Sequence, residues 1–190
     1  MSLRAMNATT LWLPRLLKRF AGDRRGVSAV EFALLAPVMI ALYLGMVEVS
    51  DGIGADRKVS LTVSTLANLT AQYTTLSTTD MTNILDASSA IITPYSAANL
   101  SMTVTCLDID KNKNVTVKWS VARNTSALSG AVTIPTDLRV PSTQLILAKV
   151  SYAYTPTIGY TISGTLNLSD RMYMAPRINA PSYNGVACAP

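Results

Sequence analysis

The stretch GVSAVE at positions 26–31, followed by the apolar run FALLAPVMIALYLGMV at positions 32–47, decides the fold of this chain. The run contains sixteen residues without a charge. As an α-helix, residues 27–49 would be about 34 Å long, since each residue adds about 1.5 Å, and this length suffices for the hydrocarbon core of a bilayer. The sequence therefore predicts a single membrane-spanning helix at 27–49, bent at Pro37.

A secretory signal peptide is an alternative for such a run, and it fits less well. A signal peptide has a shorter apolar core and ends at a cleavage site with small residues in an A-x-A-like pattern. Here EVSD at 48–51 follows the run and lacks that pattern. We expect Glu48 and Asp51 to lie at the far interface of the membrane, where a carboxylate needs no special explanation.

Charge is distributed unevenly around the apolar run. Residues 1–25 hold six cations and one anion, whereas the chain from Gly26 onward holds ten of each sign. This asymmetry follows the positive-inside rule, so we expect residues 1–25 in the cytoplasm and the C-terminal part on the other side of the membrane. The same distribution argues against a nucleic-acid-binding protein, because such a protein carries its basic residues on the folded body.

Glu31 stands at the head of the apolar run, five positions after Gly26. An ionised carboxylate near hydrocarbon is costly, so such a residue usually has a partner or a function. At these residues the chain resembles the type IV pilins, in which a basic leader ends in Gly, a prepilin peptidase cuts after that Gly, and Glu is the fifth residue of the mature chain. RRGVSAVEFAL at 24–34 is similar to the start of the TadE-like pseudopilins of tight-adherence systems, and the similar region covers about residues 24–66.

The resemblance implies a minor pilin or pseudopilin in the inner membrane of a bacterium, with residues 50–190 as a periplasmic domain. The implied cleavage site is the bond between Gly26 and Val27, which would release a leader of residues 1–26. Glu31 would pair with the freed amino group of Val27, on the same chain or on a neighbour, and neutralise both charges in an apolar filament core. The implied partners are the prepilin peptidase, other pilins and pilus-assembly proteins, and the membrane; no nucleic acid is expected.

Other interpretations of the same stem stay open. The chain could be an uncleaved, single-pass assembly factor of the same machine. It could also be a membrane-tethered periplasmic sensor, enzyme or binding domain, or the stem could be an ordinary signal anchor with an interfacial acid. The mature N-terminus distinguishes these alternatives, because only a processed pilin begins at Val27.

The periodicity of the remaining residues predicts helices first and strands afterwards. Apolar spacings of three and four predict that the first helix continues or restarts to about Tyr73, and that a second helix starts near Asp80 and ends before Pro94. The residues that carry these two patterns are Val59, Val63, Leu66, Thr70 and Tyr73, then Met81, Ile84, Leu85, Ser88, Ile91 and Ile92.

Alternation with a period of two then predicts four strands. They are expected at residues 100–106, 115–121, 145–154 and 166–174, with a hairpin turn at 110–114 and a polar loop at about 122–143. Helices packed on an antiparallel sheet, after one membrane stem, constitute an α+β fold. The resemblance implies that this fold is pilin-like.

The two cysteines, Cys106 and Cys188, lie far apart in the sequence and form no CxxC motif. Two unpaired thiols and a disulfide are both compatible with this spacing. The expected location outside the cytoplasm favours the disulfide, because oxidising compartments preserve such bonds. Closing a loop of about 80 residues would stabilise the fold by ~4 kcal/mol in the chain-entropy model.

Motifs for catalysis or metal binding are weak. The chain has no histidine, so the usual general base at neutral pH is missing, and we expect neither an enzyme nor a cofactor. The pattern DxDxNxN at 108–114 has the spacing of the first ligands of a calcium loop, but the central glycine and the final glutamate are missing, which favours a turn over a metal site. Tyr152 and Tyr154 could form a carbohydrate platform, yet alternating aromatic residues on a strand are more often packed in the core.

Overall fold

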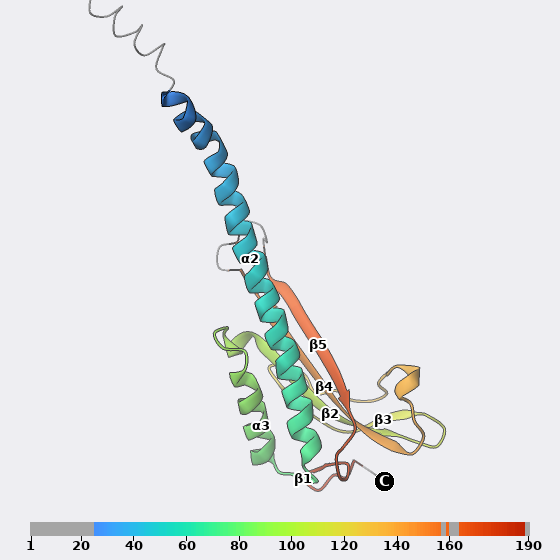
Figure 1. Ribbon diagram of the computed structural model, residues 1–190. Coiled ribbons are helices and arrows are strands. Elements are labelled where there is room, and N and C mark those ends of the chain that lie inside the picture. The colour runs from blue at the N-terminus through green and yellow to red at the C-terminus, as the bar shows by residue number, and fades with distance from the viewer. Residues whose placement is uncertain (1–24, 157–158, 160–163, 189–190) are drawn as a thin grey trace, which may run out of the picture. The chain divides into compact units, whose positions relative to one another are not determined.

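The computed structural model describes residues 25–156, 159 and 164–188 (Figure 1). The chain divides into two units, Met1–Met46 and Val47–Pro190, and the boundary lies within helix α2 (Arg25–Gln72). The described part of the first unit is the N-terminal portion of α2. The second unit holds the rest of α2 and all other described elements, in the α+β order that the sequence predicts.

After α2, the described part of the second unit contains one further α-helix, two short 3-10 helices, four long strands and two short strands. They are β1 (Thr75–Leu76), α3 (Thr78–Ala90), η1 (Ala97–Asn99), β2 (Leu100–Ile109), β3 (Val115–Arg123), η2 (Thr136–Leu138), β4 (Thr143–Tyr154), β5 (Leu166–Met174) and β6 (Ser182–Tyr183). The four long strands form one antiparallel sheet in the order β3-β2-β4-β5. The sequence predicts these four strands, whereas the parallel pair of β1 and β6 has no counterpart in the prediction.

The C-terminal half of α2 forms one wall of the core. Val59, Val63 and Leu66 are completely buried, as their helical spacing predicts. Thr70 is buried as well, and its hydroxyl donates a 2.8 Å hydrogen bond to the carbonyl oxygen of Leu66, one turn earlier. Tyr73 departs from the prediction: α2 ends at Gln72, so this side chain leaves the helical face and is 39% exposed.

Helix α3 begins with a capping box. The backbone N–H of Asp80 donates to the hydroxyl of Ser77, and the carboxylate of Asp80 accepts from the backbone N–H of Ser77. These two bonds satisfy donors that the first turn of a helix leaves free. At the other end, Lys58 of α2 donates a 3.2 Å hydrogen bond to the carbonyl oxygen of Ile91, which attaches the end of α3 to α2.

Both helices cover one face of the sheet, which we call the inner face (Figure 1). Met102, Val104 and Cys106 point to this face from β2 and are completely buried in the same cluster as the helix residues. The pairing of β2 with β4 is continuous over the whole of β2, whereas the pairing with β3 shifts between Cys106 and Leu107. The shift is a β-bulge, which locally increases the twist of the strand.

The outer face of β2 differs from the simple alternation that the sequence suggests. Thr105 and Leu107, which point away from the helices, are also completely buried. The loop between β3 and β4 covers them. The sequence predicts a loop at this position, but it does not predict that the loop packs on the sheet. Its apolar side chains form a second cluster with this end of the sheet; they are Leu128, Val132, Ile134 and Leu138.

Candidate functional site

Helix α2 carries all three residues of the predicted processing and pairing site in its first two turns. Gly26 and Val27 directly follow Arg25, the first residue of the helix, and Glu31 comes four residues after Val27. Residues four apart lie on the same face of a helix, one turn from each other. Val27 and Glu31 are both exposed. An amino group created at Val27 would therefore lie next to the Glu31 carboxylate, at the helix end where a negative charge is favoured.

Gly26 has open surroundings. A Cβ atom built on this residue would meet no other atom within 4 Å. Glycine also weakens a helix by roughly 1 kcal/mol relative to alanine, so the first turn of α2 opens more easily here than an alanine-containing turn would. The bond between Gly26 and Val27 is thus unobstructed within the described part of the chain.

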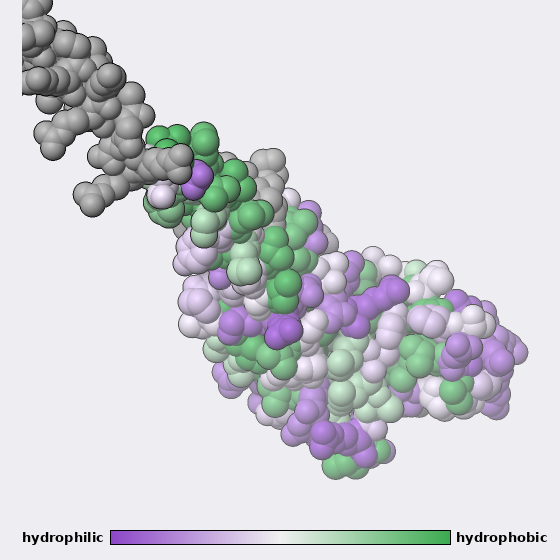
Figure 2. Space-filling view, turned by 45° about the horizontal axis from the view of Figure 1, so that its top comes forward, coloured by the Kyte–Doolittle hydropathy of each residue, from purple (hydrophilic) through white to green (hydrophobic). Residues whose placement is uncertain are grey.

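The first half of α2 exposes an apolar surface. Among the described residues, Gly26–Gln72 is the helix long and apolar enough to cross a membrane. Figure 2 shows apolar residues gathered on this part of the helix. The large exposed apolar side chains of the segment are Val27, Val30, Phe32, Leu34, Leu35, Val38, Met39, Ile40, Leu42, Tyr43 and Met46. Such a surface requires lipid or protein to cover it, and the helix indicates a membrane anchor.

Glu48 is buried and interacts with other groups, so the expectation that it needs no special explanation is wrong. Its side chain is 2% exposed, at the start of the second unit, and it interacts with the surrounding structure. Burial raises the pKa of Tyr154 above its usual value, and the nearby charges of Asp51 and Glu48 raise it further. The buried carboxylate of Glu48 is therefore part of the packed interior. Asp51, in contrast, is exposed.

Three tyrosines pack against α2 just after Glu48. The ring of Tyr95 lies 6.1 Å from that of Tyr152 and 6.0 Å from that of Tyr154, between ring centroids. The hydroxyl of Tyr95 donates a 3.0 Å hydrogen bond to the carbonyl oxygen of Asp51. A Cβ atom on Gly54 would come within 3.3 Å of the Tyr95 hydroxyl, so glycine permits the close approach.

This packing decides between the two interpretations of the strand tyrosines. Tyr152 and Tyr154 are each 5% exposed, which leaves their ring faces inaccessible to a sugar. The core interpretation is therefore confirmed. Sequence reasoning did not identify Tyr95 as the third ring. The available signal was GIG at 52–54, because a pair of glycines within a helix indicates that a large side chain lies close to the helix backbone.

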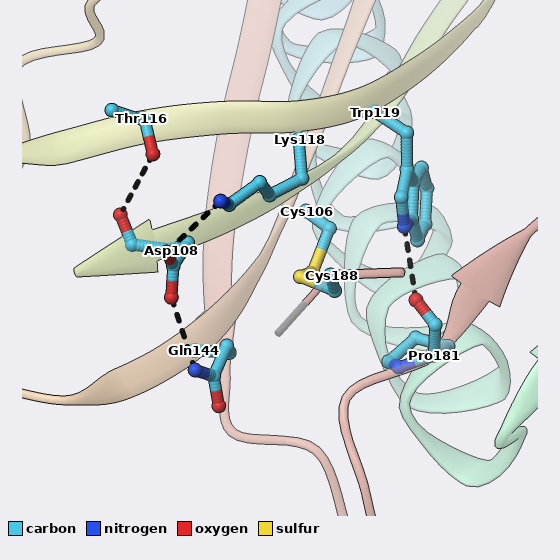
Figure 3. Close-up of a disulfide and its surroundings, with 8 residues drawn as sticks. All are labelled: Cys106, Asp108, Thr116, Lys118, Trp119, Gln144, Pro181 and Cys188. Atoms are coloured by element: carbon cyan, nitrogen blue, oxygen red, sulfur yellow. Dashed lines mark hydrogen bonds and ion pairs between the residues drawn. A yellow bond between two sulfur atoms is a disulfide. The ribbon is translucent and has the colours of Figure 1, made fainter. Parts of the chain in front are cut away.

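Cys106 and Cys188 form a disulfide, the pairing that the sequence favours (Figure 3). Both residues are completely buried, and their Cα atoms are 5.9 Å apart. The bond joins β2 to the C-terminal segment. The cross-strand neighbour of Cys106 is Trp119, whose indole N–H donates a buried 2.9 Å hydrogen bond to the carbonyl oxygen of Pro181 in the same C-terminal segment.

The two aspartates of the DxDxNxN pattern have separate structural roles. The carboxylate of Asp110 accepts hydrogen bonds from the backbone N–H groups of Asn112 and Asn114, at 2.7 and 2.8 Å, which close the hairpin turn. Asp108 lies at the sheet end, paired with Lys118 at 3.3 Å and bonded to the Gln144 amide at 3.0 Å (Figure 3). Since the two carboxylates are engaged in different contacts, the geometry supports a turn at this position.

Comparison with known proteins identifies the N-terminal stem. Residues 26–67 match the family model described as TadE-like protein. The chain is TadE-like over this segment. The TadE-like segment starts at Gly26 and covers most of α2, which confirms the resemblance and indicates involvement in a tight-adherence pilus system, in association with the membrane and with pilus-assembly proteins. No curated protein and no solved structure matches the chain.

Proposed function

We propose that this chain is a minor pilin or pseudopilin of a tight-adherence pilus system, made as a membrane precursor and cut after Gly26 by a prepilin peptidase. The observation that carries the proposal is the position of Glu31 one helical turn after Val27, within a TadE-like segment that begins at Gly26. The residues on both sides of the implied cleavage bond are exposed or unobstructed.

The proposed location is the bacterial inner membrane, with residues 50–190 in the periplasm. The excess of cations in residues 1–25 supports this orientation through the positive-inside rule. The buried disulfide between Cys106 and Cys188 supports it independently, because the periplasm is an oxidising compartment.

In the proposed mechanism, Glu31 becomes important when the stem leaves the lipid. During assembly, the apolar side chains of α2 exchange lipid contacts for contacts with other stems, and this environment is poor in water. An unpaired carboxylate or ammonium group would be strongly disfavoured there. Pairing of Glu31 with the amino group of Val27, on the same chain or on a neighbour, neutralises both charges and favours one register between stems.

The proposed role involves no catalysis. Its support is the lack of histidine in the sequence, together with the structural contacts of Asp108, Asp110 and Asp170. These carboxylates bond to side chains or backbone groups of their own sheet and helices, which is the typical arrangement of stabilising residues.

One observation favours a second candidate, an uncleaved assembly factor. The bond between Gly26 and Val27 lies inside α2 and not in an extended segment. A peptidase acts on an extended backbone, so the first turn of α2 must open before cleavage. In an assembly factor the leader would remain, and the domain of residues 50–190 would bind its partner from an intact membrane anchor.

Replacement of Glu31 tests the proposed function. Glu31→Ala should leave cleavage and membrane insertion largely intact, since neither needs a paired carboxylate. It should reduce co-purification with pilus components and attachment of cells to a surface, while Glu31→Asp, with a shorter reach, should restore both in part. Asp51→Ala is the matched control, because it removes an exposed carboxylate of the same helix outside the apolar run.

Two outcomes would contradict a specific role of Glu31. Normal attachment and normal co-purification of the Glu31→Ala protein would refute the pairing mechanism. A loss that is equally large for Asp51→Ala would show that the helix responds to any change of charge, which also contradicts a specific role for Glu31.

A further inference from the structure

Two cations stand directly opposite each other on the outer face of the sheet. Lys149 on β4 is the cross-strand partner of Arg171 on β5, and both side chains are exposed. Their chain neighbours point the other way: Val150 is buried in the main core, and Asp170 accepts a 2.7 Å hydrogen bond from Ser60 of α2. Lys149 and Arg171 therefore face away from the helices.

Like charges in this arrangement destabilise a sheet, because opposite residues of antiparallel strands have Cβ atoms only about 5 Å apart. Two other cations on the sheet have carboxylate partners. Lys118 lies 3.3 Å from the Asp108 carboxylate, and Arg123 lies 2.7 Å from that of Asp86. Within the described residues, the side chains of Lys149 and Arg171 have no ion pair or hydrogen bond.

Among the described residues, no acid lies beside the pair on the outer face. Its neighbours on that face are Ser101, Thr103, Thr105, Leu147, Ser151, Ala153, Asn167, Ser169 and Tyr173, of which Thr103, Thr105 and Leu147 are buried. The face therefore carries a net positive charge, although the chain from Gly26 onward has equal numbers of cations and anions. A surface of one sign attracts a ligand of the opposite sign.

The type of surface indicates a protein as the ligand. Ser151 and Ser169 form the next cross-strand pair, and their short side chains leave the surface flat beside the cations. A flat face cannot enclose a small molecule as a concave pocket does. Leu147 and Tyr173 form the pair on the other side, where Leu147 is buried in the second cluster and Tyr173 is half-buried against it, so the exposed part of the surface ends there. Arginine is one of the residue types that most often dominate the binding energy of protein interfaces.

We propose that the outer face around Lys149 and Arg171 is a docking surface for an acidic segment of a partner protein. Carboxylates of that segment would pair with the two cations and accept hydrogen bonds from Ser151 and Ser169. The partner would remove the repulsion between Lys149 and Arg171 as it binds. This inference goes beyond the proposed pilin role and does not depend on cleavage after Gly26.

A photo-crosslinking peptide tests the docking surface on the full chain in detergent. The probe alternates Glu and Ser and carries a photoreactive group, and mass spectrometry locates the crosslinks. We expect crosslinks within residues 143–154 and 166–174, decreased on the order of tenfold in the double variant Lys149→Ser/Arg171→Ser. In protein made without prepilin peptidase, the basic residues 1–25 are retained, and their crosslinks should occur in every variant and serve as an internal standard.

Two matched variants make the result specific. Lys111→Ser/Lys113→Ser removes the same charge from the exposed hairpin and should leave the strand crosslinks unchanged. Lys149→Glu/Arg171→Glu should lose the acidic peptide and bind a peptide that alternates Lys and Ser. The serine double variant should also melt at the same temperature as the wild type or higher, since it removes a repulsive pair.

Several results would overturn the proposal. Strand crosslinks that persist in Lys149→Ser/Arg171→Ser, or that fall equally in the hairpin variant, would contradict a specific surface. Complete competition by inorganic phosphate, at an ionic strength matched with sodium chloride, would assign the pair to a free oxyanion instead of a protein. Binding of phosphatidylglycerol vesicles that requires both cations, without binding of the peptide, would assign it to lipid. A lower melting temperature of the serine variant would show that the pair stabilises the fold.

Discussion

The indole N–H of Trp119 donates a 2.9 Å hydrogen bond to the carbonyl oxygen of Pro181, across a buried contact between β3 and the C-terminal segment. The ring of Trp119 also packs against Tyr183, with centroids 5.7 Å apart. Trp119 is in addition the cross-strand neighbour of Cys106, which is bonded to Cys188. A hydrogen bond, a ring contact and a disulfide thus hold the end of the chain against the sheet.

Trp119→Phe should destabilise the domain by about 1–3 kcal/mol, because it leaves the buried carbonyl of Pro181 without a donor. Chemical unfolding of the detergent-solubilised protein, followed by circular dichroism, measures the change. Tyr183→Phe is the matched control, since it keeps the ring next to Trp119 and removes only a hydroxyl. Equal stability of the Trp119→Phe and Tyr183→Phe proteins would show that the bond to Pro181 contributes nothing.

Cys188→Ala should destabilise the domain by about 2–5 kcal/mol, since it releases a loop closed by a bond between residues 82 apart. Intact mass of the unreduced wild type should be lower than that of the dithiol form by two hydrogen atoms. Because both cysteines are completely buried, an alkylating reagent should modify neither of them after brief reduction unless a denaturant is present. Free, alkylatable thiols in untreated protein from the cell envelope would contradict this prediction.

Acid should weaken the start of α3 through Asp80. Hydrogen bonds from the side chain and backbone of Ser77 lower the pKa of Asp80 below its usual 3.8. The ionised carboxylate therefore stabilises the folded state above pH 3.8, and this contribution is lost as the pH falls through the lower folded-state value. Asp80→Ala should melt below the wild type at neutral pH, and the two should converge as the pH falls below the lowered folded-state pKa of Asp80. A constant difference across this range would exclude the carboxylate as the cause; Asp137→Ala, in an exposed position, is the control.

Glu48→Ala should lower the stability of the domain by on the order of 2 kcal/mol, because it removes a buried, interacting carboxylate beside Tyr154. Asp51→Ala, one turn later on the exposed side, should be close to neutral. Thermal unfolding of the two variants in the same detergent provides the comparison. Equal melting temperatures for both variants would place Glu48 in water and not in the core.

The helical part of the fold could be predicted because local patterns dominate it. Val59, Val63 and Leu66 have the spacing of a single buried stripe, and the structure buries all three. Asp80 marks the first turn of α3 because its capping contact with Ser77 involves neighbours only three residues apart. Such contacts are encoded in short stretches of sequence, so composition and spacing suffice to find them.

The contacts made by distant segments could not be predicted in the same way. Thr105 has the polar character of a solvent-facing strand residue, yet it is buried because its hydroxyl bonds to Ser120 at 2.8 Å and the β3–β4 loop covers both. Leu128 and Ile134 lie in a loop rich in polar residues, and only the three-dimensional path of that loop brings them to the sheet. Glu48 was misplaced for the same reason, since the tyrosine beside it comes from β4.

The sequence predicted the residues of the candidate processing site, but it did not predict the cation pair on the sheet. Gly26, Val27 and Glu31 were identified by a short motif, and the structure adds that they share the first two turns of one helix. The pair of Lys149 and Arg171 had no signal at all in the sequence. The two residues become neighbours only through the register of β4 with β5, which the sequence does not define.

The N-terminus of the mature protein tests the central claim most directly. Mass spectrometry of protein extracted from membranes of cells with active prepilin peptidase should find a chain that begins at Val27 and lacks residues 1–26. Gly26→Leu should retain the full leader. A Cβ at Gly26 meets no atom within 4 Å, so the added side chain fits at this position of the helix. It also strengthens the first turn of α2, so this variant opposes cleavage both at the peptidase and through the helix opening that cleavage requires. Intact chains that begin at Met1, recovered from the same cells while the peptidase is active, would contradict the pilin account and favour the uncleaved assembly factor.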